Sequence, residues 1–142
     1  MRASDGSIDR PLFGAWIVAL GATGGALFIG EVLGQAPCDL CWFQRAFMFP
    51  LAVLLGVAIL REDRSVRPYA LSLVAVGGAI AAFHSLRYFG VVPEAIRPCT
   101  ATGPSCTGEG MTVLGFPIPL LSLGAFAAIG FLLLIPSRVQ AR

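Results

Sequence analysis

The stretch Leu12–Leu33 reads LFGAWIVALGATGGALFIGEVL, an apolar run whose one charged residue, Glu31, lies near its end. A helix needs about 20 such residues to cross the ~30 Å hydrocarbon core of a bilayer. Lipid offers the backbone no hydrogen-bond partners, so a segment there must satisfy its own polar groups, and a single run does so only as a helix. This stretch therefore predicts a membrane-spanning helix.

Three further runs of the same kind follow in the 142-residue chain, at Trp42–Leu60, Tyr69–Phe89 and Phe116–Ile135. The composition agrees, because 56% of the residues are hydrophobic, 13% are charged and the mean hydropathy is +0.81. A soluble domain carries about 25% charged residues, and so apolar a chain does not stay disordered. The net charge of +2, with no basic cluster among aromatic residues, argues against a nucleic-acid partner. We expect an all-α integral membrane four-helix bundle that forms one domain over residues 1–142.

Arginine predicts the orientation, since the chain has no lysine. Seven arginines flank the runs on one side, at positions 2, 10, 61, 64, 67, 138 and 142, whereas Arg97 alone lies in the loops of the other side. The positive-inside bias makes the first side cytoplasmic. We therefore expect both termini in the cytoplasm and the loops Gly34–Cys41 and Gly90–Gly115 outside. A cleaved signal peptide is disfavoured, because the first apolar run exceeds the ~7–15 residues usual for one.

All four cysteines fall in the two outer loops, Cys38 and Cys41 in the first, Cys99 and Cys106 in the second. An even set on the oxidising face of a membrane indicates disulfide chemistry. The first pair is a C-x-x-C motif at the mouth of a helix, where the amide groups of the first turn favour the thiolate that disulfide exchange requires. Two structural alternatives remain, stapling disulfides and a four-cysteine zinc site, and the wide spacing of the second pair disfavours zinc.

Ionisable residues gather near the outer ends of the predicted helices. Arg45 follows Cys41 by four residues and so shares its helix face. It either snorkels to the interface or serves as a cationic partner for the Cys41 thiolate and an electron acceptor beside it, and the shared face favours the second interpretation. His84 is expected at a similar depth, and Glu31 and Arg87 are expected to be interface anchors or an ion pair. We hypothesise that Cys41, Arg45 and His84 line one pocket.

Residues 37–45, PCDLCWFQR, carry a family resemblance. They fit the C-x-L-C-hydrophobic-x-x-Arg block of the DsbB/BdbC family of membrane disulfide-bond formation proteins, which the chain also resembles in its four runs and its two outer cysteine pairs. Two features depart from the best-known long-loop members. Only six residues separate Cys99 from Cys106, and Gln44 stands where those members often carry an acid.

The resemblance implies a membrane thiol-disulfide oxidoreductase with four catalytic cysteines. A DsbA-like thioredoxin-fold protein would attack the Cys99–Cys106 disulfide at Cys99. The reduced loop pair would pass its electrons to Cys38–Cys41, with Cys38 the more exposed sulfur. Cys41 would then deliver them to a membrane quinone, either ubiquinone or menaquinone.

The quinone-binding residues implied are Arg45 and Cys41, with His84 added by our pocket hypothesis, and no metal is expected. The implied location is the bacterial inner membrane as a multi-pass protein, with its cysteine loops on the periplasmic or extracellular side, in contact with lipid and the quinone pool. The main alternative is a structural membrane protein whose outer loops carry stapling disulfides. A small transporter is disfavoured, because the ionisable groups all lie toward one end of the spans.

Overall fold

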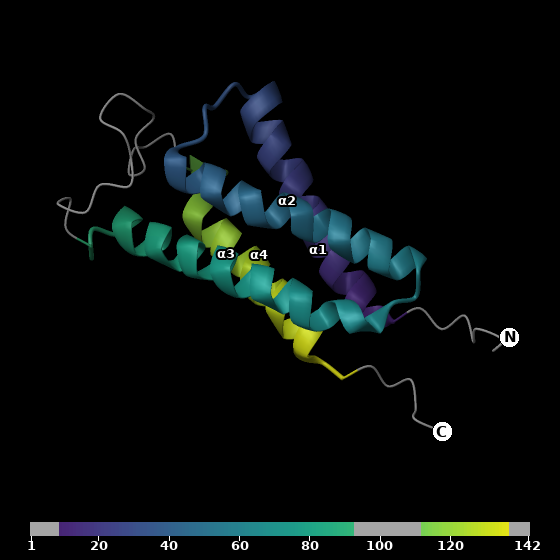
Figure 1. The fold of residues 1–142 in the computed structure, drawn as a ribbon. Helices are drawn as coiled ribbons and strands as arrows, with labels where there is room; N and C mark the ends of the chain where they lie inside the picture. The colour runs from purple at the N-terminus through teal and green to yellow at the C-terminus, as the bar shows by residue number, and fades with distance from the viewer. Residues whose placement is uncertain (1–8, 93–111, 137–142) are drawn as a thin grey trace, which may run out of the picture.

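The computed structural model describes residues 9–92 and 112–136 (Figure 1). Helix α1 (Arg10–Leu27) continues into a π-helical turn, η1 (Phe28–Val32), and is followed by α2 (Asp39–Leu60). A short 3₁₀ turn, η2 (Arg64–Val66), leads into α3 (Arg67–Tyr88). After the undescribed segment, β1 (Thr112–Val113) and β2 (Phe116–Pro117) pair as a small antiparallel hairpin in front of α4 (Ile118–Leu134). The predicted all-α class is confirmed.

When η1 is counted with α1, the helix bounds agree with the predicted runs to within three residues. Among the described residues, three helices are long and apolar enough to cross a membrane, namely Arg10–Val32, Asp39–Leu60 and Arg64–Tyr88. Helix α4 is apolar but has 17 residues, about 26 Å at 1.5 Å per residue, which is the lower limit for a span. It begins two residues later than predicted because Pro117 is paired in the hairpin and caps the helix.

Each helix packs against two others, in the cyclic order α1, α2, α3, α4. The largest fully buried apolar side chains between them include Leu51, Leu55, Phe126 and Ile129. Helices α3 and α4 approach closely at Gly77, where a Cβ atom would collide with the Phe126 ring. Large apolar side chains also cover the outer faces of all four helices, as expected for a bundle surrounded by lipid.

The two ends of the bundle differ. The start of α1, the α2–α3 turn and the end of α4 lie together at one end (Figure 1), where Arg67 hydrogen-bonds to Asp9 of the α1 N-cap and to backbone carbonyls that end α4. Turn η1, the start of α2 and the end of α3 lie at the opposite end. The C-x-x-C motif and His84 are therefore at the end away from this arginine.

Candidate functional site

The C-x-x-C motif forms the N-terminus of α2. Cys38 is the N-cap residue, and its Sγ accepts a hydrogen bond from the Cys41 backbone N–H at 3.4 Å. This is the position usually taken by a Ser, Thr, Asp or Asn side chain. The Sγ atoms of Cys38 and Cys41 lie 2.9 Å apart and are not bonded. The motif therefore holds two sulfurs within reach of each other in the positive field of a helix N-terminus.

The expectation that Cys38 is the more exposed sulfur is wrong. Its side chain is 0% exposed, whereas Cys41 is partly exposed. The physical reason is the capping role, which folds the Cys38 side chain back over the first turn of α2. There it packs in an apolar cluster with Leu40 and side chains that include Ile80 and Phe83 of α3.

The pKa of Cys38 is lowered from 9.0 to about 5. The largest cause is the side-chain hydrogen bond shared with the Cys41 sulfur. Burial opposes the shift, while the contact with His84 and the Cys41 backbone N–H add to it. The lowered pKa favours the thiolate of Cys38 when the pair is reduced, and the thiolate is the form that carries out disulfide exchange.

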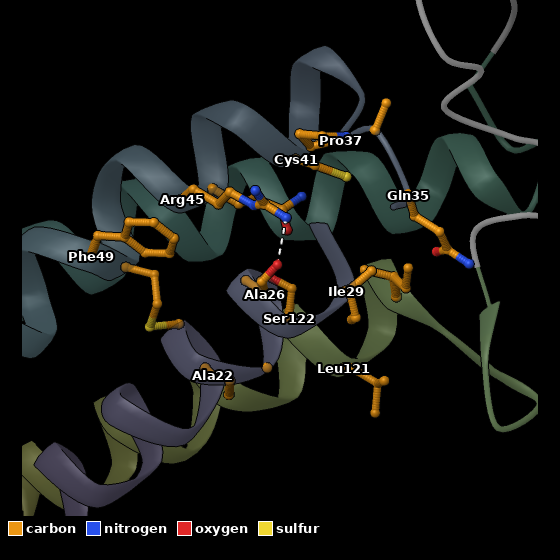
Figure 2. A pocket seen from close by; sticks show the side chains of 16 residues that line it. Ala22, Ala26, Ile29, Gln35, Pro37, Cys41, Arg45, Phe49, Leu121 and Ser122 are labelled. Carbon is orange, nitrogen blue, oxygen red and sulfur yellow. Dashed lines mark hydrogen bonds between the residues drawn. The ribbon is translucent and has the colours of Figure 1, made fainter. Parts of the chain in front are cut away.

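A pocket of about 260 Å³ opens beside Cys41 (Figure 2). It lies between α1 with η1, the α1–α2 connection, α2 and α4. Its walls are mostly apolar, and the lining residues with a polar or thiol side chain are Gln35, Cys41, Gln44, Arg45 and Ser122. The pocket is thus an apolar chamber with a few polar groups, which is usual for small-molecule sites.

Arg45 lines this pocket one turn below Cys41, as the helical spacing predicts. Its Nη2 donates a hydrogen bond to the Ala26 carbonyl at 2.8 Å, and the guanidinium lies 5.5 Å from the centre of the Trp42 ring. Figure 2 shows the guanidinium beside Cys41 and the hydrogen bond to Ala26. The part of the pocket hypothesis that concerns Cys41 and Arg45 is confirmed.

His84 does not line this pocket, so that part of the hypothesis is wrong. Helix α3 contributes none of the lining, and His84 is instead buried between α3 and α2 at 0% exposure. Its Nε2 lies 3.8 Å from Cys38 Sγ, and its Nδ1 lies 2.9 Å from Nε2 of Gln44. His84 therefore contacts Cys38 from outside the pocket lining.

Gln44 is the site residue that the sequence reasoning missed, having noted it only as a departure from a family pattern. Its side chain is 5% exposed and connects the pocket lining to His84. The available signal was its spacing of three residues from Cys41, which places the two on one helix face. Of the two expected interface residues, Glu31 is exposed and Arg87 is buried at 9% exposure.

Cys38, Cys41 and His84 offer three metal-ligand atoms within 4.8 Å of one another, and thiolates with imidazole are donors that zinc accepts. The Gln44 contact disfavours this use. An amide NH₂ group can only donate, so Nδ1 is the acceptor and the proton of a neutral His84 is on Nε2, the atom that faces the cysteines.

The second predicted cysteine pair, Cys99 and Cys106, lies outside the residues that the structure describes.

A thiolate-forming C-x-x-C pair at the mouth of an apolar helix defines a membrane protein of thiol-disulfide chemistry. Residues 9–136 match the family described as "Disulfide bond formation protein DsbB". The chain belongs to this family, and it is a disulfide-forming membrane protein with thiol oxidoreductase activity.

Relatives from three bacteria carry names that refer to disulfide formation. A "Probable disulfide formation protein" of Metapseudomonas resinovorans is 59% identical over 124 residues, which cover 87% of this chain and 86% of the relative. One from Deinococcus radiodurans is 42% identical, covering 92% and 90%. "Disulfide bond formation protein C" of Bacillus subtilis is 38% identical, covering 83% and 86%. No solved structure matches the chain.

Proposed function

We propose that this protein is a protein-dithiol:quinone oxidoreductase. A DsbA-like thioredoxin-fold dithiol is its electron donor, and exchange with the Cys99–Cys106 disulfide oxidises that donor and reduces the loop pair. Exchange of the loop dithiol with the Cys38–Cys41 disulfide then restores the loop disulfide and reduces the helix pair. The observation that carries the proposal is that Cys41 and Arg45 face one apolar pocket.

The lining and the volume of the pocket support a quinone as the molecule that binds there. Its apolar walls suit a molecule that resides in the bilayer, and its volume of about 260 Å³ is close to the lower end of ligand pockets, about 300 Å³. Bound there, ubiquinone or menaquinone would accept the two electrons and two protons that the reduced Cys38–Cys41 pair gives up as it returns to the disulfide. The Arg45 guanidinium would offset negative charge on a quinone oxygen, and it does so more strongly where water is excluded.

The proposed setting is the bacterial inner membrane, with both termini cytoplasmic and the two cysteine loops in the periplasm. The arginine distribution supports this orientation. So does the arrangement of the helices, because the start of α1 and the end of α4 share one end of the bundle and the C-x-x-C motif lies at the other. The chain then acts as a single domain whose helices carry the acceptor site and whose outer loop 90–115 meets the donor protein.

The test is turnover by purified protein in detergent with a reduced thioredoxin-fold dithiol protein and a soluble quinone analogue, followed by quinone absorbance. We expect steady reduction that Cys41→Ser abolishes and that Ser72→Ala, an exposed serine of α3, leaves unchanged. Cys99→Ser should abolish transfer from the protein donor yet retain turnover with dithiothreitol. Absence of quinone reduction, with all four cysteines oxidised throughout, would instead indicate a structural protein with stapling disulfides.

A further inference from the structure

A chain of three polar groups connects α2 and α3 behind the cysteine pair. Gln44 Nε2 lies 2.9 Å from His84 Nδ1, and His84 Nε2 lies 3.8 Å from Cys38 Sγ. Cys38 and His84 are 0% exposed and Gln44 is 5% exposed. Water therefore does not compete for these contacts, and each group depends on its protein neighbours.

The chemistry of the amide decides where the His84 proton is. The Gln44 NH₂ group is a donor only, so His84 Nδ1 must accept from it. A neutral imidazole has one N–H, and this arrangement assigns it to Nε2. The Nε2–H then points toward Cys38 Sγ as a hydrogen-bond donor.

We propose that Gln44 is a positioning residue that holds His84 in the Nε2–H tautomer, so that His84 donates to the Cys38 thiolate and makes the Cys38–Cys41 pair more oxidising. The donor stabilises the charged sulfur of the reduced pair and gains nothing comparable from the neutral disulfide. Stabilising the reduced form raises the reduction potential. The lowered pKa of Cys38 agrees with this, since the His84 contact is one of its causes. The inference rests only on the redox activity of this pair and requires no quinone and no particular donor protein.

His84 makes the tautomer directly measurable, because it is the one histidine of the chain. In the intact protein, reduced and free of quinone, ¹⁵N-histidine labelling gives one imidazole whose two nitrogen signals assign the proton. We expect Nε2 protonated and Nδ1 bare at neutral pH. A proton on Nδ1, or on both nitrogens, would overturn the proposal without any substitution that could disturb folding.

The second arm measures the equilibrium of the pair with dithiothreitol. Cys99→Ser and Cys106→Ser leave Cys38–Cys41 as the sole disulfide, and Gln44→Met replaces the amide with an apolar chain of similar length. We expect the equilibrium constant for reduction to fall about tenfold, which corresponds to about 30 mV. Ser85→Ala is the matched control, because Ser85 is a buried α3 neighbour of His84 whose hydroxyl donates to the Ala81 carbonyl of the same helix.

A double-mutant cycle separates positioning from a merely structural role. His84→Leu alone should lower the equilibrium constant for reduction by dithiothreitol at least as much as Gln44→Met does. Gln44→Met added to His84→Leu should then change nothing further, because Gln44 acts through His84. Additive effects, or an unchanged constant in Gln44→Met, would contradict the proposal. Quinone is absent throughout, so the position of Gln44 in the pocket wall does not influence the result.

Discussion

Gly30 has no side chain and so leaves room for the Arg45 guanidinium beside the pocket. A Cβ atom at Gly30 would lie 3.3 Å from Arg45 Nη2 and 3.4 Å from Nη1. We expect Gly30→Ala to push the guanidinium away from the Ala26 carbonyl and to raise the apparent KM for a quinone analogue about fivefold, with a larger rise for Arg45→Ala. Gly24→Ala is the control, since a Cβ there meets nothing within 4 Å. Equal KM values for Gly30→Ala and Gly24→Ala would show that Gly30 does not position Arg45.

Single residues were predictable from the sequence where they lie within one helical turn of each other. Arg45 follows Cys41 by four residues, and the structure brings both to one pocket as the periodicity of a helix dictates. The contact of His84 with Cys38 joins residues 46 positions apart. The predicted depth in the membrane placed His84 near the level of Arg45 but did not predict which side of α2 it would occupy. That depends on how α3 packs, which no local pattern specifies.

The position of the cysteine pair at the N-terminus of α2 predicts how its reduction potential depends on pH. Its cap, Cys38, has a pKa of about 5, chiefly because of the proton shared with the Cys41 sulfur. Below that pH the reduced pair holds two protons, and above it only one, so the stabilisation of the thiolate is present above pH 5 and lost as the pH falls. The reduction potential should therefore change by about 59 mV per pH unit below pH 5 and about 30 mV per unit above it.

Equilibration with glutathione buffers between pH 4 and 8, with Cys99 and Cys106 replaced by serine, gives these slopes. A Cys38→Ser variant provides no disulfide and serves as the blank for the labelling of free thiols. One uniform slope of about 59 mV per unit over the whole range would mean that the cap does not lower the Cys38 pKa.

Among whole elements, the long apolar helices were the most predictable, because lipid leaves a polar backbone no alternative. The π-helical turn η1 at Phe28–Val32 was not predictable. Such turns often occur at functional sites, and this one ends α1 beside the pocket, where Gly30 meets the Arg45 side chain. Hydropathy and helical periodicity do not distinguish a π-helical turn from the α-helix that it continues.

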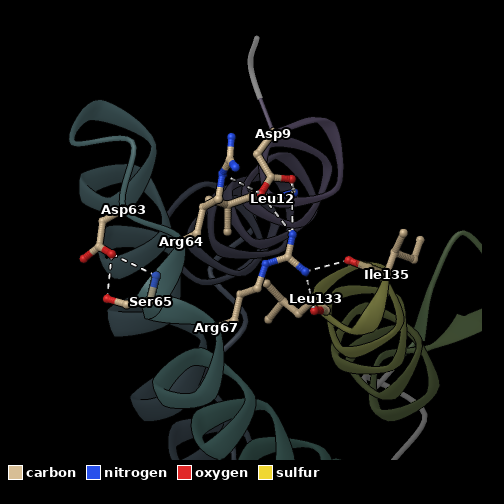
Figure 3. Close-up of polar contacts among 8 residues, drawn as sticks. All are labelled: Asp9, Leu12, Asp63, Arg64, Ser65, Arg67, Leu133 and Ile135. Atoms are coloured by element: carbon tan, nitrogen blue, oxygen red, sulfur yellow. Dashed lines mark hydrogen bonds and ion pairs between the residues drawn. The ribbon is translucent and has the colours of Figure 1, made fainter. Parts of the chain in front are cut away.

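The bundle as a whole is closed at the end opposite the cysteines by Arg67 (Figure 3). Its Nη1 donates to the Leu133 and Ile135 carbonyls at 2.8 and 2.6 Å, and its Nη2 pairs with Asp9 at 3.0 Å, so one side chain joins the ends of α1, α3 and α4. The Arg67 and Asp9 side chains are 16% and 7% exposed, and removing one partner of a buried ion pair leaves the other uncompensated.

We therefore expect Arg67→Ala to lower the free energy of unfolding by about 2–4 kcal/mol, measured by thermal or detergent-induced unfolding. Arg64→Ala is the matched control, because Arg64 reaches the same Asp9 at 3.8 Å from a side chain that is 41% exposed, and such exposed pairs contribute at most about 1 kcal/mol. If the two variants have the same free energy of unfolding, apolar packing rather than Arg67 stabilises this end of the bundle. Because the cysteine pair lies at the far end, its dithiothreitol equilibrium should stay unchanged in Arg67→Ala while the protein remains folded.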